Sequence, residues 1–238
     1  MKERILLMGP PGCGKTHQLL RVAEYLQPKS TCYVIDMEDK IDAYHSGNVP
    51  KYLNLSVAIF WEELKEVMDK VGAAVEPNDW IMVDRIDLSW PAVQRWFTQQ
   101  RYKQELAQRM LATAKAITKP SMFIPRFDEG SWQVINEEYE TLILKFLYKY
   151  RCNVLMTSGI RGVDLNSPQD IFGHLGVVPR GQKELGHQPN TVFLLTMKRG
   201  ESLSWHITTA KDIPSRDWFD GEPLFDLGLQ YLERYGIR

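Results

Sequence analysis

The amino-acid sequence predicts an α/β fold with a mostly parallel central sheet. Short apolar runs of strand length recur along the 238 residues, and segments with helical apolar spacing alternate with them, as in β-α-β units. A glycine-rich motif joins the first apolar run to the first helical segment. These three observations indicate an α/β domain organised around that motif.

The glycine-rich motif, residues 9–16, matches the G-x-x-x-x-G-K-[ST] pattern of a phosphate-binding loop, or P-loop. Gly9 and Gly14 lack a Cβ atom, so the backbone can curl and point its N–H groups at phosphate oxygens. Lys15 adds a positive charge for the β- and γ-phosphates, and the Thr16 hydroxyl can bind Mg²⁺. The N-terminus of the following helix favours the same anion.

The sequence around the loop supports this interpretation. Residues 4–8 form an apolar run suited to a buried strand, and apolar residues recur at helical spacing over 19–26 until Pro28. Strand, glycine loop and helix in this order are the context that the motif requires. The residues expected to bind a nucleoside triphosphate are Gly9, Pro10, Pro11, Gly12, Cys13, Gly14, Lys15, Thr16 and His17.

The rest of the chain continues the alternation of strands and helices. Further strands are predicted at 31–38, 53–60, 80–84, 153–159, 191–197 and 202–209, the last two as an antiparallel hairpin. Helices are predicted over 61–75, 91–119, 131–151, with Ser131 as its cap, and 225–235. We expect a single domain over 1–238, with a helical insertion at about 90–130 and a long, functional or mobile loop at about 160–189.

The run Trp80–Asp84 is four apolar residues followed by an acid and resembles a Walker B strand. In such sites the carboxylate lies beside the P-loop and holds Mg²⁺, usually through water. Many core strands also end at a polar cap, but the P-loop upstream favours the metal-binding interpretation of Asp84. Asp87 is a weaker second acid and is expected to be a turn residue or a helix cap.

Basic residues dominate the segment 95–126, where only Glu105 opposes them. They are Arg95, Arg101, Lys103, Arg109, Lys115, Lys119 and Arg126. Two interpretations remain open: a solvated helix face, which is the commoner origin of such runs, or a patch that follows a phosphate backbone.

The composition is that of an ordinary globular protein, with 44% hydrophobic and 25% charged residues and a formal net charge of −1. No global basic character indicates nucleic acid, so such binding would need a local patch. The sequence shows neither a run of transmembrane length nor a signal peptide, so we expect no membrane association and a cytoplasmic location. The scattered cysteines, Cys13, Cys32 and Cys152, are expected to be reduced thiols.

Residues 31–42 resemble the segment of RecA-type ATPases in which a strand ends in D-x-E and continues toward the adenine pocket. The resemblance implies a three-layer RecA-like P-loop NTPase core whose mostly parallel sheet carries a C-terminal antiparallel hairpin. It implies that Glu38 is the general base that activates the attacking water, and that Asp42 and Tyr44 lie near the base. An ordinary acidic residue at the end of a strand is an equally good interpretation of Glu38.

Two later segments extend the resemblance. Residues 154–161 resemble the RecA strand that carries a γ-phosphate sensor, normally glutamine, so Ser158 or Thr157 takes that place here. Residues 160–189 then correspond to the loop that contacts single-stranded DNA. Its candidate contacts are Arg161, Arg180 and Lys183. In the terminal hairpin, basic residues of that family reach a neighbouring subunit's phosphates. The candidates are Lys211, then Lys198 and Arg199.

More closely, the chain is similar over about residues 3–215 to short phage and prophage RecA-like ATPases implicated in single-strand annealing and recombination, which share the G-P-P-G-x-G-K-T loop. This implies a Mg²⁺-dependent ATPase that binds ATP or ADP, with Lys15, Glu38 and Asp84 as catalytic residues and Thr16 and Asp84 at the metal. It also implies a homo-oligomer, as a ring or filament, that acts on single-stranded DNA, in the host cytoplasm if phage-encoded.

Other functions remain open. A nucleotide-gated assembly or scaffold protein with weak turnover fits the substituted sensor and the near-neutral charge. A DNA packaging or remodelling motor of the AAA+ kind would need an Asp-Glu pair at the Walker B position, but Arg85 follows Asp84. A small-molecule or nucleoside kinase would need an arginine-rich lid, and 161–180 is sparse in arginine.

Overall fold

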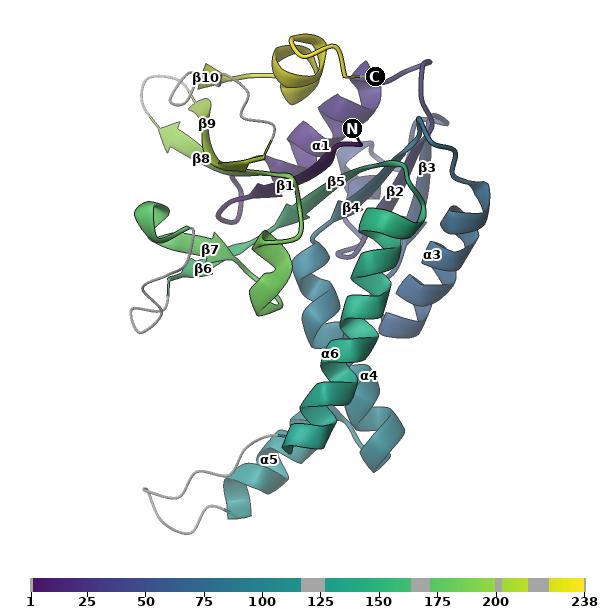
Figure 1. Cartoon of the computed structure of the whole chain (residues 1–238), viewed down its shortest axis with the longest axis vertical. Helices are drawn as coiled ribbons and strands as arrows, with labels where there is room; N and C mark the ends of the chain where they lie inside the picture. Colours follow the sequence, from purple (N-terminus) through teal and green to yellow (C-terminus); the bar gives the residue numbers. More distant parts are fainter. Residues whose placement is uncertain (1, 117–126, 164–171, 200–202, 214–222, 238) are drawn as a thin grey trace.

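The computed structural model describes residues 2–116, 127–163, 172–199, 203–213 and 223–237 (Figure 1). An eight-stranded sheet forms the middle of the molecule, in the order β10-β9-β8-β1-β5-β4-β2-β3. Its strands are β1 (Arg4–Met8), β2 (Cys32–Asp36), β3 (Leu53–Val57), β4 (Trp80–Asp84), β5 (Asn153–Ser158), β8 (Thr191–Arg199), β9 (Leu203–Asp212) and β10 (Pro223–Leu224).

The sheet is parallel from β8 through β3, while β9 and β10 are antiparallel additions at one edge. The predicted α/β class, the mostly parallel sheet and the C-terminal antiparallel hairpin are therefore confirmed. The carboxyl ends of parallel strands meet at one edge of a sheet, where ligands bind in α/β folds. The P-loop and the acids that follow β2 and β4 all lie at this edge.

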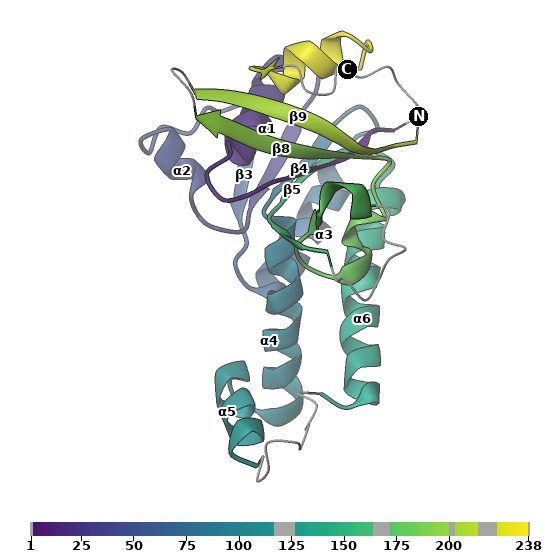
Figure 2. The same ribbon diagram turned by 90° about the vertical axis from the view of Figure 1, so that its left-hand side faces the viewer.

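Helices cover both faces of the sheet (Figures 1 and 2). The α-helices are α1 (Lys15–Tyr25), α2 (Ile41–Tyr44), α3 (Trp61–Ala74), α4 (Ser89–Tyr102), α5 (Leu106–Ala116) and α6 (Glu129–Leu144). Shorter helical segments are η1 (Ile86–Leu88), η2 (Lys145–Lys149), η3 (Gly173–Leu175), η4 (Lys183–Gly186) and η5 (Gly228–Glu233), of which η2 and η5 are π-helical.

Two apolar cores lie on the two faces because side chains alternate along each strand. On β1, Ile5 and Leu7 pack with α1 and η5, whereas Leu6 and Met8 pack with α3, α4 and α6. The central strands are buried on both faces, as expected for parallel strands between helices. This arrangement gives the three layers that the sequence predicted.

The helical region that follows β4 differs from the prediction. Instead of one helix over 91–119, α4 ends at Tyr102, Lys103 follows with a left-handed backbone (φ 54°), and α5 begins at Leu106. Lys103 is not one of the residues that usually mark a left-handed helix end, so local sequence does not indicate this break. Residues 117–126, with Lys119 and Arg126, lie outside the described part.

The helices α4 and α6 extend together away from the sheet, with α5 at their far end (Figures 1 and 2). Aromatic rings join them: Trp90 of α4 stacks on Trp132 of α6 (6.2 Å between centroids), and Phe97 of α4 meets Phe127, just before α6, edge-on (5.8 Å). The cap of α6 is Asp128, whose carboxylate accepts the Ser131 N–H (2.7 Å), rather than Ser131 as predicted.

The described parts of the segment 160–189 contain secondary structure that the sequence did not predict. Strands β6 (Ile160–Gly162) and β7 (Val177–Pro179) form a small antiparallel sheet beside the main one. Strands of three residues are too short to show a hydrophobic period, which is why the sequence predicted only a loop. Residues 164–171 lie outside the described part.

No helix within the described ranges combines the length and apolar character needed to cross a bilayer. All three cysteines are buried and unpaired. Burial raises the pKa of the Cys32 thiol to about 12 and that of Cys152 to about 11. Both groups are therefore thiols, not thiolates, at neutral pH.

Two helix glycines give a matched test of the packing. A Cβ on Gly72 of α3 would lie 2.2 Å from ring atoms of Tyr150, whereas on Gly130 of α6 the nearest atom is 3.6 Å away. We expect Gly72→Ala to lower the free energy of unfolding by about 1–3 kcal/mol through overpacking. Gly130→Ala should be neutral or raise it by up to about 1 kcal/mol. Urea denaturation measures both, and equal effects would contradict the packing of α3 against Tyr150.

Candidate functional site

The P-loop follows β1 and leads into α1, and two of its glycines are required by their surroundings. A Cβ on Gly9 would lie 2.4 Å from the Leu195 carbonyl oxygen, so only glycine lets the loop pass β8. Gly14 has φ 90°, and a Cβ there would lie 2.7 Å from Nε1 of Trp205. Because Gly14 is the N-cap of α1 and has no side chain, the first N–H groups of the helix remain available to an anion.

Lys15 folds back onto its own loop. Its Nζ donates hydrogen bonds to the carbonyl oxygens of Gly9 (2.9 Å) and Pro10 (2.8 Å) and lies 3.7 Å from Cys13 Sγ. Burial raises the pKa of Cys13, and the neighbouring Lys15 charge opposes this shift. The ammonium therefore lies within the loop, and an anion seated there would meet a cation already in place.

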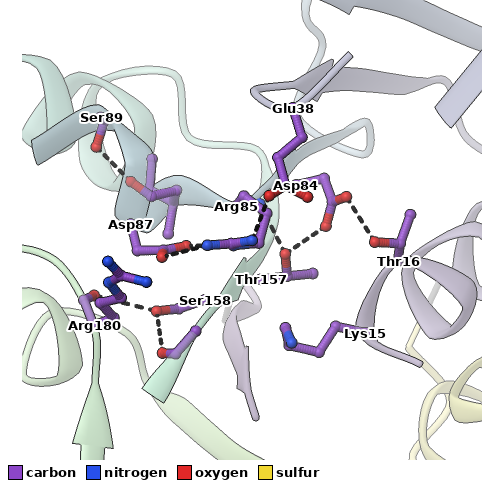
Figure 3. A network of polar contacts seen from close by, with 12 residues as sticks. Lys15, Thr16, Glu38, Asp84, Arg85, Asp87, Ser89, Thr157, Ser158 and Arg180 are labelled. Atoms are coloured by element: carbon purple, nitrogen blue, oxygen red, sulfur yellow. Dashed lines mark hydrogen bonds and ion pairs between the residues drawn. The ribbon is translucent and has the colours of Figure 1, made fainter. Parts of the chain in front are cut away.

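Asp84, at the end of β4, joins the loop to the neighbouring strand (Figure 3). Thr16 Oγ1 donates to Asp84 Oδ2 (2.7 Å), and Thr157 Oγ1 donates to Asp84 Oδ1 (2.5 Å). The side chain is almost completely buried, and burial raises the pKa of Asp84, an effect that the two hydroxyl hydrogen bonds oppose. The sequence-predicted neighbours Thr16 and Asp84 thus lie in direct contact.

The Thr16 and Asp84 oxygens fit a magnesium ion bound together with a nucleotide. Within the described ranges, no three His, Cys, Asp or Glu side chains are grouped to hold a metal by themselves. Mg²⁺ at phosphate sites needs no such cage, because it takes one or two protein oxygens and completes its shell with phosphates and water. A hydroxyl and a carboxylate beside a P-loop provide those oxygens.

Glu38 lies two residues after β2, which pairs with β4 so that Asp36 lies opposite Asp84. The Asp36 carboxylate accepts the backbone N–H groups of Glu38 (2.8 Å), Lys40 (2.7 Å) and Ile41 (2.7 Å). These bonds turn the chain just after the strand and hold Glu38 at the same edge as Asp84. The sequence marked Asp36 only as part of a strand end, so its role as the residue that shapes this turn was missed.

Arg85 occupies the centre of the site and has a left-handed backbone (φ 64°), a conformation that costs a non-glycine residue of order 1–3 kcal/mol. Its guanidinium donates to both Asp87 oxygens (2.9 and 3.0 Å) and to Glu38 Oε1 (2.5 Å). Its backbone N–H donates to Thr157 Oγ1 (2.8 Å). The hydrogen bonds to Asp87 raise the pKa of Arg85.

Asp87 lies in the short η1 turn, as predicted, but its side chain does not cap η1 or α4. Its side chain is fully buried beneath Arg85 and holds that guanidinium with both oxygens. The order Asp-Arg-Ile-Asp was visible in the sequence, but it does not show which way the guanidinium turns. That depends on β2 lying beside β4.

The P-loop, Glu38 and Arg85 line one open pocket of about 510 Å³, a volume typical of small-molecule sites. Its walls are Pro11, Gly12, Gly14, Lys15, Thr16, His17, Glu38, Lys40, Tyr44, Arg85 and Trp205. Of the two predicted base contacts, Tyr44 lines the pocket, whereas Asp42 is exposed on α2 and is not part of the wall.

Trp205, on β9, is the aromatic residue of the pocket that the sequence did not reveal. Its ring stacks on His17 at 5.2 Å between centroids, and its Nε1 is buried without a hydrogen-bond partner among the described residues. Nothing in the alternating pattern of the hairpin distinguishes Trp205, because its place depends on β9 crossing over the P-loop.

The two candidate sensor residues point in different directions (Figure 3). Thr157 is bonded to Asp84, beside the pocket. Ser158 instead donates to the carbonyl oxygens of Gly159 (2.8 Å) and Arg180 (3.2 Å), at the base of the small sheet.

The basic candidates lie at separate places. Arg161 is exposed on β6, and Arg180 and Lys183 follow β7. Lys211 lies inside β9 rather than just past its end, and its Nζ donates to the carbonyl oxygens of His187 and Pro189 (2.7 Å each).

The hairpin register separates the remaining candidates. Because Lys211 pairs with Val192, it lies at the start of β8, away from the P-loop edge. Lys198 pairs with Ser204 near the other end of the hairpin. The backbone of Arg199 ends β8, and its side chain lies outside the described part.

The buried Asp84 carboxylate predicts a dependence of stability on pH. Because the folded protein keeps the Asp84 proton to a higher pH than the unfolded chain, ionisation lowers the free energy of unfolding as the pH rises through the folded-state pKa. We therefore expect the difference in stability between Asp84→Asn and the unsubstituted protein to shift in favour of the variant from pH 4.5 to pH 8 in magnesium-free buffer. Urea denaturation at both pH values measures it. Asp69→Asn, at an exposed acid, is the control, and a difference independent of pH would contradict the assignment.

Comparisons with known proteins give one family match and one similar solved structure. No curated protein matches the chain. Among solved structures, the crystal structure of the RadB recombinase is similar to it, with 14% sequence identity and a TM-score of 0.46, over 93% of this chain and 84% of that one. The family model described as an AAA domain matches residues 1–164, from the P-loop strand through β6. Since this match covers more than half of the 238 residues, the protein belongs to the AAA domain family.

Proposed function

We propose that the protein is a Mg²⁺-dependent ATPase that acts on single-stranded DNA in recombination, as a homo-oligomer. The observation that carries the ATPase proposal is the meeting of four groups at one pocket, three in its wall and one beside it. Lys15, Thr16 and Glu38 line it, and Asp84 is bonded to Thr16 beside it. Membership of the AAA domain family supports nucleotide binding.

The chain's own groups would divide the work of hydrolysis. Lys15 and the N–H groups at the start of α1 would hold the phosphates and stabilise the charge of the transferring group. Thr16 and Asp84 would hold Mg²⁺, which when bound neutralises charge on the β- and γ-phosphates. Tyr44 would lie along the nucleoside.

Glu38 would accept the proton of the attacking water. As the oxygen of that water bonds to the γ-phosphorus, the bond from this phosphorus to the β–γ bridging oxygen breaks, and ADP and phosphate leave. Glu38 is suited to this role because Asp36 fixes its backbone and it lines the P-loop pocket. The base thus comes from the strand next to β4, not from the residue after Asp84.

The DNA part of the proposal rests on charge and position. Arg161, Arg180 and Lys183 border the small β6–β7 sheet, which continues directly from β5. Because β5 pairs with β4, which ends at Asp84, only the strand β5 would separate a nucleic acid at the small sheet from the residues around Asp84. In an oligomer, Lys198, Arg199 or Lys211 of one subunit would approach the phosphates of the next, which for Lys211 means leaving two carbonyl partners.

One observation favours a second candidate, a nucleotide-gated assembly protein with weak turnover. In this structure Glu38 is paired with Arg85 (2.5 Å) and with Lys40 (3.3 Å), so two cations compete for the carboxylate that should accept a proton. If this pairing persisted with ATP bound, hydrolysis would be slow while binding still changed the assembly.

The first test is ATP turnover. We expect Glu38→Gln to lower kcat by about 10²–10⁴-fold, because a general base typically contributes that much, while ATP affinity is retained. Lys15→Ala should remove nucleotide binding itself.

Asp39→Asn is the matched control for Glu38→Gln. Asp39 is the adjacent exposed acid, and asparagine tolerates its left-handed φ of 55°. Equal turnover in the protein and in Glu38→Gln would refute the base assignment. ATP-dependent assembly without turnover would favour the second candidate.

The second test is dependence on DNA. We expect single-stranded DNA to raise ATP turnover, and added salt to reduce the stimulation because phosphate contacts release counterions. Arg161→Gln should weaken the stimulation and its salt dependence, whereas Lys70→Gln, which removes an exposed cation paired with Glu66 on α3, should not. Equal and salt-insensitive rates with and without DNA would leave only the ATPase part standing.

A further inference from the structure

Arg85 lies between the nucleotide pocket and the small β6–β7 sheet (Figure 3). On the pocket side its side chain, 18% exposed, forms part of the wall together with Lys15 and Thr16. There it is paired with Glu38 at 2.5 Å. With Lys15 and Lys40, Arg85 gives the pocket wall three cationic side chains among the described residues.

On its other side Arg85 is fixed by Asp87, which reaches the base of the small sheet. A Cβ on Gly159 would lie 3.3 Å from Asp87 Oδ2, and one on Gly181 would lie 3.2 Å from Asp87 Cα. Both glycines therefore allow the chain on either side of the β6–β7 pair to pack closely on Asp87.

The same place is held by hydrogen bonds from the small sheet to β5. The Arg180 N–H donates to the Gly159 carbonyl (2.8 Å), and Ser158 Oγ donates to the Arg180 carbonyl (3.2 Å). A displacement of the Asp87 side chain would therefore affect the residues just before β6 and just after β7.

The hydroxyl groups of β5 are already engaged and do not offer an alternative sensor. Thr157 is bonded to Asp84 and to the Arg85 N–H, and Ser158 faces Arg180. The Arg85 guanidinium, by contrast, can exchange one anionic partner for another without leaving a buried charge unpaired.

We propose that Arg85 is the residue by which this protein distinguishes a nucleoside triphosphate from a diphosphate: the γ-phosphate replaces Glu38 as its partner, and Asp87 carries the change to the β6–β7 sheet. The inference rests on the proposed ATPase function. The exchange releases Glu38 only when a γ-phosphate is present. The planar guanidinium of Arg85 suits a phosphate group, because phosphate oxygens can accept two parallel hydrogen bonds from it.

The experiment measures the affinities of a non-hydrolysable ATP analogue and of ADP, both with Mg²⁺, by calorimetry. In Arg85→Gln we expect the preference for the analogue over ADP to fall by about 10–100-fold, the range for a charged hydrogen bond, with ADP affinity changed less than about twofold. Arg85→Lys keeps the positive charge but not the planar pair of donors. Its preference for the analogue over ADP should lie between those of the unsubstituted protein and of Arg85→Gln.

A double variant, Arg85→Gln/Glu38→Gln, removes the repulsion of an unpaired Glu38 from the phosphate. It should show the same loss of preference as Arg85→Gln alone. Arg21→Gln is the matched control, because Arg21 also bridges two acids, Glu24 and Asp226, but does not line the pocket. The preference of this variant for the analogue over ADP should equal that of the unsubstituted protein.

Hydrogen exchange supplies a second measurement that a purely structural role would not change. The analogue, but not ADP, should alter exchange at the Arg180 amide and over 177–181, and Arg85→Gln should abolish this difference. Asp87→Asn should retain part of the nucleotide preference and lose the exchange response.

An unchanged preference and an unchanged exchange response in Arg85→Gln and Arg85→Lys would overturn the inference while leaving the ATPase proposal intact. Failure of the unsubstituted protein to bind either nucleotide would overturn both.

Discussion

The carboxylate of Asp84 is the contact on which the rest of the site depends. Its two oxygens accept hydroxyl hydrogen bonds from Thr16 at the start of α1 and from Thr157 on β5, so one side chain joins three elements. This is possible because β1, β5 and β4 are parallel neighbours whose carboxyl ends share one edge. The buried charge opposes stability, and the hydroxyl groups reduce this cost without removing it.

Much of the framework could be predicted from local sequence. The P-loop, the strands at 4–8 and 80–84 and the hairpin of β8 and β9 all carry short-range patterns, so their existence followed from periodicity and turn residues. The helix break at Lys103 and the three-residue strands β6 and β7 carry no such pattern. The small sheet packs against Asp87, a residue distant in sequence, and such a contact leaves no local pattern.

The candidate site divides in the same way. Lys15, Thr16 and Asp84 belong to motifs that specify both residue type and position. Arg85 and Trp205 belong to no motif. Arg85 lies in the site through its contact with Glu38, which follows β2, and Trp205 lies there because β9 passes the P-loop. The positions of such residues are the hardest to predict from neighbouring sequence, because the surrounding structure imposes their conformation.

The extended α6 has a mechanical consequence. Its 16 residues span about 24 Å, and through η2 it runs into the start of β5, the strand that holds Thr157. Because Trp132 stacks on Trp90 of α4, a force applied at this end acts on both helices. It is passed on to β4, which ends at Asp84 and precedes α4, as well as to β5.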